Sequence, residues 1–398
     1  MRMPPASFLA LSFLLSTTAV QAQSPLASPA FAFSGSGFLT LGAGRMLGGH
    51  RDDVGNRECP CYPVDYGQGG IYDGRGGLQW GPDSKLGLQG TASLTGTDLS
   101  VTAQAVMRGA RDGKTNLEWL YASYRLNERI TLQAGRKRLP MFYYSDIQDV
   151  GFALPWTHLP PAVYGWEAVN YDGLNLLYQD HWGGWSSTLN LLAGGEHRKE
   201  SGYYKITDGR RNRTDVKWDN IAGGDLTLAK DWFEARLVYI QSHTRKKSVT
   251  GYWDRGLGDL DSATIDADFG PAARQKIHGI ALNADWRDWL VRGEFIYISH
   301  PGLNYRDYAQ QVAVGHRLGR WQPTLTWTRY KQGAVLDQGA DPAAMEAWTV
   351  RTFTLRYDLT GTSALKVQFD DKREQSGPDY AYRFGNSRLL TFTYDRVF

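Results

Sequence analysis

The chain has 398 residues, a formal net charge of +3 and a mean hydropathy of -0.44, and 13% of its residues are aromatic. Acidic and basic residues nearly balance and no segment is basic enough to supply phosphate contacts, which excludes a nucleic-acid binder. Two cysteines exclude a disulfide-rich scaffold, whereas 45 glycines and the many aromatic residues favour strands, bends and membrane interfaces.

Residues 1–22 are predicted to be a secretory signal peptide. Arg2 precedes an apolar run from Phe8 to Leu15, and small residues follow up to Ala22, where cleavage is expected. The apolar run is far shorter than the roughly 20 residues that a membrane-spanning helix needs. We therefore expect the mature chain, residues 23–398, to be exported and to form one domain.

From Phe33 onward, polar and apolar residues alternate in segments bounded by turn residues, the pattern of β-strands. We predict about sixteen strands on this pattern. They span residues 33–46, 84–95, 98–108, 115–126, 129–136, 173–179, 185–193, 217–229, 232–243, 275–286, 289–299, 307–318, 321–331, 348–359, 363–371 and 386–398. The connections alternate between about two residues and roughly ten to forty, as in outer-membrane barrels with short periplasmic turns and long extracellular loops.

The predicted strands have one apolar face and one polar face. In the strand 232–243, Phe233 and Leu237 share one face, and Glu234 and Arg236 lie on the other. A soluble β-sandwich alternates in the same way, with its apolar face turned inward. Alternation alone therefore leaves the soluble and membrane classes open.

Two features favour a membrane barrel. Aromatic residues lie at strand ends beside the short turns, where an interfacial girdle is expected. They are Trp185, Trp232, Trp286, Trp289, Trp321 and Phe398. The last strand also ends on Phe398, with Leu390, Phe392 and Tyr394 on the same face. An even number of strands lets the first pair with the last, so that no edge stays unpaired.

A long aromatic loop, about residues 139–171, follows the fifth predicted strand. Pro140, Pro155, Pro160 and Pro161 exclude regular strand or helix there. The loop carries much apolar surface, in the residues Phe142, Tyr143, Tyr144, Phe152, Trp156, Tyr164 and Trp166. A loop this long and this aromatic is usually functional and packed on something. We expect it to fold inside the barrel and to narrow the lumen.

On these features the chain resembles a Gram-negative outer-membrane porin. The resemblance rests on the signal ending Val20-Gln21-Ala22, the hairpins after Ser84, the terminal strand 389–398 and the loop after the fifth strand, where such porins keep their constriction loop. It departs from the family at Arg396, where an aromatic residue is usual, and in the long first loop.

The resemblance implies an all-β fold, a transmembrane antiparallel β-barrel of about 16 strands in the outer membrane. It implies contact with outer-membrane lipid and lipopolysaccharide, commonly as a homotrimer, and no cofactor. The implied function is a water-filled channel for passive diffusion of small hydrophilic solutes and ions, without enzymatic activity.

In such porins, basic residues of the wall face acids of the constriction loop, and the resemblance carries these roles to eight residues here. On the wall they are Lys85, Arg108, Arg136, Lys137 and Arg138, and on the loop Asp146, Asp149 and Glu167. Opposed charges across water create a transverse field that orients dipolar solutes. The alternative for any one of them is a solvated lumen residue without a role. The loop aromatics either pin the loop to the wall or form an apolar track for a solute.

A substrate-specific channel for a sugar, phosphate or another anion, or a dicarboxylate is the main alternative function. An outer-membrane hydrolase needs a clustered Ser, His and orienting residue, and the eight histidines are scattered. A structural barrel or adhesin has no need of the basic cluster 136–138. Charges of both signs leave the ion preference open, and that cluster favours a slight preference for anions.

Two smaller motifs lie in predicted loops. Cys59 and Cys61, predicted to be extracellular, form either a local disulfide or two thiols without a function, because metal binding needs more ligands. The acidic loop from Asp254 to Asp268 matches no Ca²⁺-binding template, which favours a solvated loop over a cation site.

Overall fold

A computed structural model describes residues 30–50, 57–209, 213–250, 266, 268–380 and 383–398. The predicted signal peptide, residues 1–22, lies outside the described residues. So do Asp254, Asp259 and Asp261 of the acidic loop. No helix in the described part of the chain is long and apolar enough to cross a membrane.

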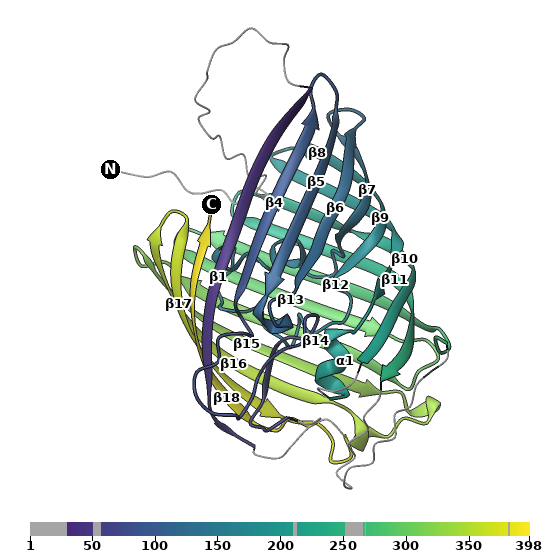
Figure 1. Ribbon diagram of the computed structural model, residues 1–398, viewed down its shortest axis with the longest axis vertical. Coiled ribbons are helices and arrows are strands. Elements are labelled where there is room, and N and C mark those ends of the chain that lie inside the picture. Colours follow the sequence, from purple (N-terminus) through teal and green to yellow (C-terminus); the bar gives the residue numbers. More distant parts are fainter. Residues whose placement is uncertain (1–29, 51–56, 210–212, 251–265, 267, 381–382) are drawn as a thin grey trace.

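Sixteen strands form a closed antiparallel barrel, which confirms the predicted fold (Figure 1). The first eight are β1 (Phe31–Gly49), β4 (Lys85–Leu94), β5 (Leu99–Arg108), β6 (Thr115–Arg125), β7 (Ile130–Arg138), β8 (Asn170–Trp182), β9 (Trp185–Arg198) and β10 (Arg213–Lys230). The others are β11 (Phe233–Thr250), β12 (Ala273–Trp286), β13 (Trp289–Ser299), β14 (Tyr305–His316), β15 (Trp321–Ala334), β16 (Ala347–Thr360), β17 (Ser363–Glu374) and β18 (Ser387–Val397). Each strand pairs with its neighbour in sequence, and β1 pairs with both β4 and β18.

Eight short elements lie in the described connections, and six of them precede β10. They are the hairpin strands β2 (Tyr62–Asp65) and β3 (Gly70–Tyr72), the helix α1 (Gly202–Thr207), and three of the 3₁₀ turns, η1 (Gly109–Arg111), η2 (Ser145–Ile147) and η3 (Gly151–Ala153). Two further 3₁₀ turns, η4 (Leu336–Gln338) and η5 (Pro342–Ala344), precede β16. The β2–β3 hairpin corrects the prediction of a first loop without strands, since its short strands lack the alternation used to find the barrel strands.

The barrel is apolar outside and polar inside. On β11, the side chains of Leu237 and Tyr239 are exposed by 49% and 43%, whereas Arg236, one position away, is exposed by only 8%. Exposed tryptophans lie beside the short turns, namely Trp182, Trp232, Trp286, Trp289 and Trp321. This is the distribution that lipid outside and a polar lumen inside require.

The seam between β1 and β18 closes the barrel. The backbone of Gly37 donates to the carbonyl of Phe398 at 2.7 Å, and the amide of Phe398 donates back to Gly37 at 3.0 Å. Inside the seam, the Thr40 hydroxyl donates to Asp395 Oδ1 at 2.6 Å. The wall therefore has no unpaired edge, as a membrane barrel requires.

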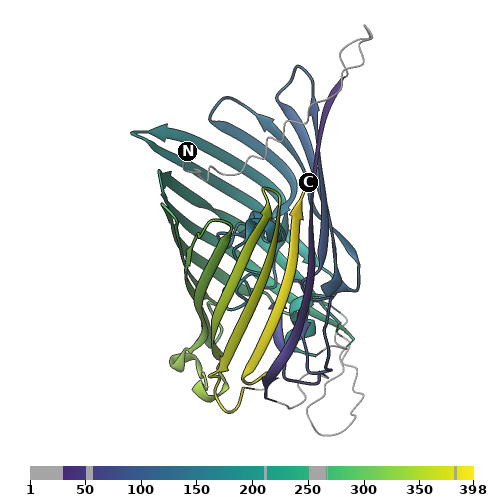
Figure 2. The same cartoon turned by 90° about the vertical axis from the view of Figure 1, so that its left-hand side faces the viewer.

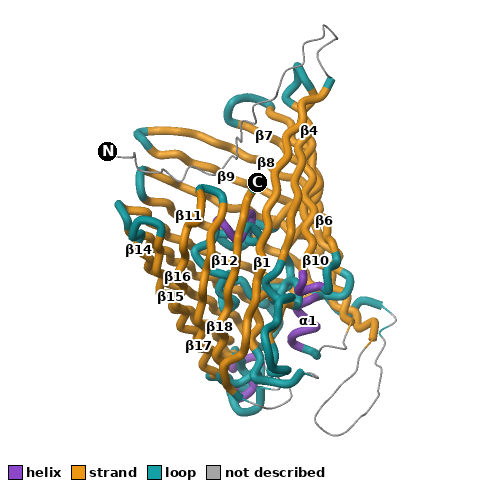
Figure 3. The backbone as a smooth tube through the Cα atoms, turned by 60° about the vertical axis from the view of Figure 1, so that its left-hand side comes forward, coloured by secondary structure: helices purple, strands orange, loops and turns teal. Residues whose placement is uncertain are grey.

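Three connections fold into the barrel and pack together. They are residues 57–83 with the β2–β3 hairpin, residues 139–169 between β7 and β8, and α1 (Figures 2 and 3). Tyr62, Tyr72, Met141 and Tyr204 from these connections share one buried apolar cluster with wall residues such as Ile240. We call residues 139–169 the inward segment; it is shorter than the predicted loop 139–171 because β8 already begins at Asn170.

Cys59 and Cys61 form a disulfide. The two side chains are exposed by only 6% and 0% and belong to the interior apolar cluster, a burial that was not predicted from the sequence. The aromatic residues around them, including Tyr62 and Tyr72, draw the first loop into the barrel, since leaving such apolar surface in water is unfavourable.

Candidate functional site

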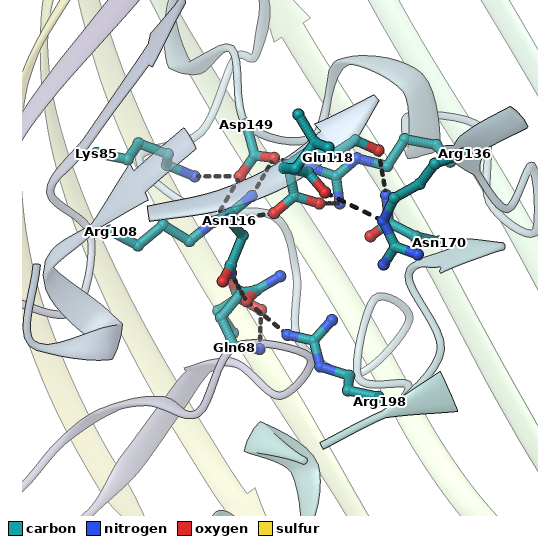
Figure 4. Close-up of polar contacts among 12 residues, drawn as sticks. Gln68, Lys85, Arg108, Asn116, Glu118, Arg136, Asp149, Asn170 and Arg198 are labelled. Carbon is teal, nitrogen blue, oxygen red and sulfur yellow. Dashed lines mark hydrogen bonds and ion pairs between the residues drawn. The ribbon is translucent and has the colours of Figure 1, made fainter. Parts of the chain in front are cut away.

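A buried ion-pair network joins the inward segment to the wall. Asp149 of the segment accepts from Arg108 Nη2 at 2.6 Å, and Arg138 contacts the same carboxylate (Figure 4). Glu118 on β6 also pairs with Arg108, and with Arg138 Nη1 at 3.2 Å. Lys85 Nζ lies 3.8 Å from Asp149. Three basic wall residues thus surround two carboxylates, and four of the five side chains are exposed by 6% or less.

The pKa of Asp149 lies well below its usual range. Burial alone would raise it, but the cations Arg108, Arg138 and Lys85 outweigh burial and favour the carboxylate. Asp149 is therefore ionised throughout the neutral range. The Asp65 carboxyl, on β2, is within electrostatic reach of Lys85 and Arg108, and burial raises its pKa.

The inward segment is also attached to β15 and β17. Lys366 Nζ on β17 donates to the carbonyls of Gly151 and Trp156 at 2.6 and 2.8 Å and forms an ion pair with Asp395 at 3.0 Å. The indole of Trp156 donates to Thr326 Oγ1 at 2.8 Å. Gly151 lies so close to the seam that a Cβ there would be 2.0 Å from Asp395 Oδ1. Only glycine allows this approach.

A second buried cluster centres on His158 of the inward segment. Its ring nitrogens lie 3.2 Å from Asp83 and 3.3 Å from Asp370. Burial alone would lower the pKa of His158, but the two carboxylates raise it to about 10. The imidazolium is therefore charged at neutral pH and holds the segment between β17 and the end of the first loop.

One stretch of the inner wall, on β4 to β7, carries polar side chains that are half-buried, apart from the buried Thr102 and Gln104. Its side chains form a hydrogen-bonded polar ladder. Gln104 donates to Gln89 at 2.9 Å, Thr91 and Thr102 lie 3.0 Å apart, Gln133 donates to Ser123 at 3.0 Å, and Lys137 contacts Gln133. We call these residues the polar strip. Lys137 also lies over the Tyr121 ring, with its Nζ 5.2 Å from the ring centroid.

The predicted site residues divide into three groups. Lys85, Arg108, Arg138 and Asp149 meet in the ion-pair network. Lys137 and the exposed Asp146 act on each other electrostatically, and no direct ion pair joins these two residues among the described contacts. Arg136 and Glu167 lie elsewhere.

Arg136 belongs to the outer face. It lies opposite Leu120, which is exposed by 47%, and pairs with Asp172 at 2.9 Å and with Glu196 at 2.7 Å. Glu167 is buried and accepts from the indole of Trp218 at 2.9 Å. Burial raises its pKa. Neither the Arg136 guanidinium nor the Glu167 carboxylate faces the polar strip.

Sequence reasoning missed several partners of the inward segment. Glu118, Glu294 and Lys366 are inward-facing charges on strands that were predicted, so their facing was readable from the alternation. Glu294 accepts from the hydroxyl of Tyr164 at 2.6 Å and from the backbone of Tyr143 at 2.8 Å. The partner of each of these charges in the inward segment depends on contacts across the barrel, and no local sequence pattern encodes those contacts.

Two polar cavities lie in the interior. The central cavity, between the inward segment and the first loop, has a volume of about 40 Å³ and is lined by Lys85, Asp149, His158 and Asp83 among others. The mouth cavity, at the end of the long connections, has a volume of about 330 Å³. Pro82 lines both. The central cavity has room for only about three water molecules, at roughly 10–15 Å³ for each.

The described residues contain no group of three or more His, Cys, Asp or Glu side chains that could hold a metal ion. The chemistry available at the site is therefore that of fixed charges and hydrogen-bonding groups along a polar wall.

The sequence matches no known family and no curated protein. Solved structures nevertheless resemble this fold. OmpT of Vibrio cholerae in its trimer form is similar over 93% of this chain and 100% of its own, with 9% identity and a TM-score of 0.56. An anion-selective porin from Comamonas acidovorans is similar over 92% and 100%, with 15% identity and a TM-score of 0.53. OmpF of Salmonella typhi, in complex with daunomycin, is similar over 92% and 97%, with 10% identity and a TM-score of 0.54.

At these identities the likeness concerns the fold and not the site. What this chain shares with them is the barrel fold, which in this chain is a closed barrel of sixteen antiparallel strands. This chain thus has the barrel fold of the outer-membrane porins.

Proposed function

We propose that the protein is an outer-membrane porin that lets small hydrophilic solutes and ions diffuse passively through its barrel. The observation that carries the proposal is the polar strip on β4 to β7, most of whose side chains are only half-buried, inside a wall that is apolar outside. A row of amides, hydroxyls and one ammonium group can replace the hydration of a passing solute, as the lining of a pore does. A barrel without a transport role has no use for such a row.

The proposed constriction lies where the inward segment meets the strip. Lys137 on the wall and Asp146 on the segment are its opposed charges, and Lys85 lies deeper, beside the ion-pair network. Because the surrounding barrel wall has a low dielectric constant, field lines between such charges concentrate in the polar path. The proposed constriction residues Arg136 and Glu167 drop out of this set on geometric grounds.

A homotrimer in the outer membrane is part of the proposal. One similar structure, OmpT of Vibrio cholerae, is described in a trimer form. Cross-linking the protein in native outer membranes, followed by electrophoresis of unheated samples, tests the proposed state, and a single band at the mass of one chain would contradict it.

A solute-specific channel is the second candidate. The observation that favours it is the small central cavity of about 40 Å³, which Asp149 and Lys85 line. A general pore needs a wider path than this cavity offers, whereas a specific channel can exchange hydration for contacts with the wall.

Single-channel conductance in a planar bilayer separates these functions. Large ohmic steps that sugars, phosphate and amino acids leave unchanged are expected for a general porin. Small steps that one class of solute blocks in a saturable way identify a specific channel. A folded barrel that produces no steps and gives no solute uptake in liposomes contradicts both.

A further inference from the structure

The mouth cavity combines basic side chains from three separate connections. Arg57 and Arg75 come from the first loop, Arg111 and Lys114 from the β5–β6 connection and Lys205 from α1. The acidic lining residues are Asp112 and Glu200. Five cations thus surround a polar space together with two carboxylates.

Ion pairs with neighbouring residues neutralise some of these lining charges and leave others without an ion-pair partner among the described residues. Arg75 is neutralised by Asp73 at 2.6 Å. Glu200 is neutralised by Arg213, which lies outside the lining, at 2.6 Å, and lies 3.6 Å from Lys205. Arg111 and Lys114 have no ion-pair partner in the described part of the chain. Burial and, to a smaller extent, the neighbouring Arg108 lower the pKa of Arg111.

A buried hydrogen-bond donor lines the same space. Gln68 is exposed by only 3%, and its Oε1 accepts from Arg198 Nη2 at 2.7 Å and from Asn116 Nδ2 at 3.4 Å (Figure 4). Its Nε2 has no acceptor among the described residues. Buried donors left without an acceptor cost free energy, so such donors indicate a missing acceptor.

We propose that the mouth cavity binds a small oxyanion with two or more negative charges, such as phosphate or a dicarboxylate, before the anion enters the barrel. Arg111 and Lys114 attract the anion, and its oxygens accept the hydrogen bonds that these two side chains and Gln68 Nε2 can donate. The volume of about 330 Å³ accommodates such an anion with part of its hydration shell. The inference deepens the proposed channel function and rests on it.

Calorimetric titration of the full-length protein, folded in detergent, tests the site with inorganic phosphate and with succinate at constant ionic strength. Saturable binding of either anion is expected, and it weakens as salt is added because screening reduces the attraction. Binding of phosphate alone assigns a tetrahedral oxyanion, and binding of succinate alone assigns a dicarboxylate. Absence of saturable binding for both anions overturns the inference.

Three variants locate the binding. Arg111→Gln combined with Lys114→Gln is expected to weaken binding by about tenfold or more, the value of one lost charge-assisted hydrogen bond. Gln68→Glu keeps an acceptor for Arg198, so it preserves the fold, but places a negative charge at the cavity and is expected to abolish binding. Arg245→Gln, on β11, removes a cation from an exposed pair with Asp219 on β10 and is the matched control.

The outcomes separate the site from the channel. Binding within twofold of the unaltered protein in both cavity variants overturns the inference. A protein that conducts but binds neither anion leaves the proposed function standing and removes the site. A protein that binds phosphate in the cavity but never conducts retains the site and removes the channel.

Discussion

The Asp149 carboxylate accepts two hydrogen bonds from the Arg108 guanidinium, at 2.6 and 3.3 Å, where the inward segment meets β5. Both side chains are buried, exposed by 6% and 2%. Acids of the loop and bases of the wall therefore meet in direct contact at this point, and not across water. Among the site residues predicted from the sequence, a transverse field of the expected kind remains between Asp146 of the inward segment and Lys137 of the polar strip.

Replacing Asp149 by Asn is expected to lower the free energy of unfolding by about 3–5 kcal/mol, because it leaves Arg108 and Arg138 buried with only Glu118 as a carboxylate partner. Urea unfolding in lipid vesicles measures the change. Asp172→Asn is the matched control, since Asp172 is exposed by 61% and pairs only with Arg136 here. Equal losses in the two variants would contradict a structural role for the buried network.

Ion selectivity should depend on Lys137 and not on its neighbour Arg136. Lys137→Gln is expected to shift the reversal potential under a salt gradient toward cations, and Asp146→Asn toward anions, because each removes one of the two opposed charges at the strip. Arg136→Gln removes the same charge from the outer face and should leave the reversal potential unchanged. A shift in Arg136→Gln as large as in Lys137→Gln would refute the assigned facing.

The stability of the barrel should fall as pH rises above neutral, through His158. Burial disfavours its imidazolium, but Asp83 and Asp370 raise its folded pKa to about 10 from an ordinary value of about 6.5. A raised pKa contributes stability that is full below the unfolded pKa and lost as pH rises through the folded value. Unfolding midpoints between pH 6 and about 10.5 should decline more steeply in the unaltered protein than in His158→Gln. Parallel pH profiles for the two proteins would exclude this role.

Trp156→Ala is expected to cost about 3–5 kcal/mol of unfolding free energy, because the side chain is fully buried between the segment and β15. Thr326→Val removes only the hydrogen bond to the indole and should cost about 1 kcal/mol. The same vesicle unfolding assay compares them. Trp156→Ala should also increase current noise in single channels, since the segment loses its deepest anchor. A quiet channel with unchanged stability would show that Trp156 is not an anchor.

The barrel strands were predictable because the membrane and the lumen impose period two on every strand. Predicted ends were less accurate in β10, which begins four residues earlier than predicted, and in β11, which ends seven residues later. The added residues of β11, 244–250, are almost entirely polar and give no alternation. The cluster Arg136, Lys137 and Arg138 shows the limit of the rule. Alternation separates Lys137 from Arg136, but Arg138 leaves its expected face because the chain turns into the lumen after it.

The ion pairs of the site were not predictable in this way. Their residue types and inward facing follow from the strands, whereas their partners depend on the path of the inward segment across the barrel. Asp149, for example, meets β4, β5 and β7 at one carboxylate. The burial of Cys59 and Cys61 had no local signal either, since a loop of small and polar residues reads as solvated until its aromatic neighbours are placed.

The attachment of the inward segment to several strands of the barrel has a mechanical consequence. Asp149 ties it to β5 and β7, and Lys366 ties Gly151 and Trp156 of the same segment to β17 beside the closing seam. These contacts hold the segment at fixed positions on the wall, so a rigid part of the molecule sets the diameter of the path. Changes of permeability in this protein should accordingly come from charge and occupancy along the path, with the diameter held constant.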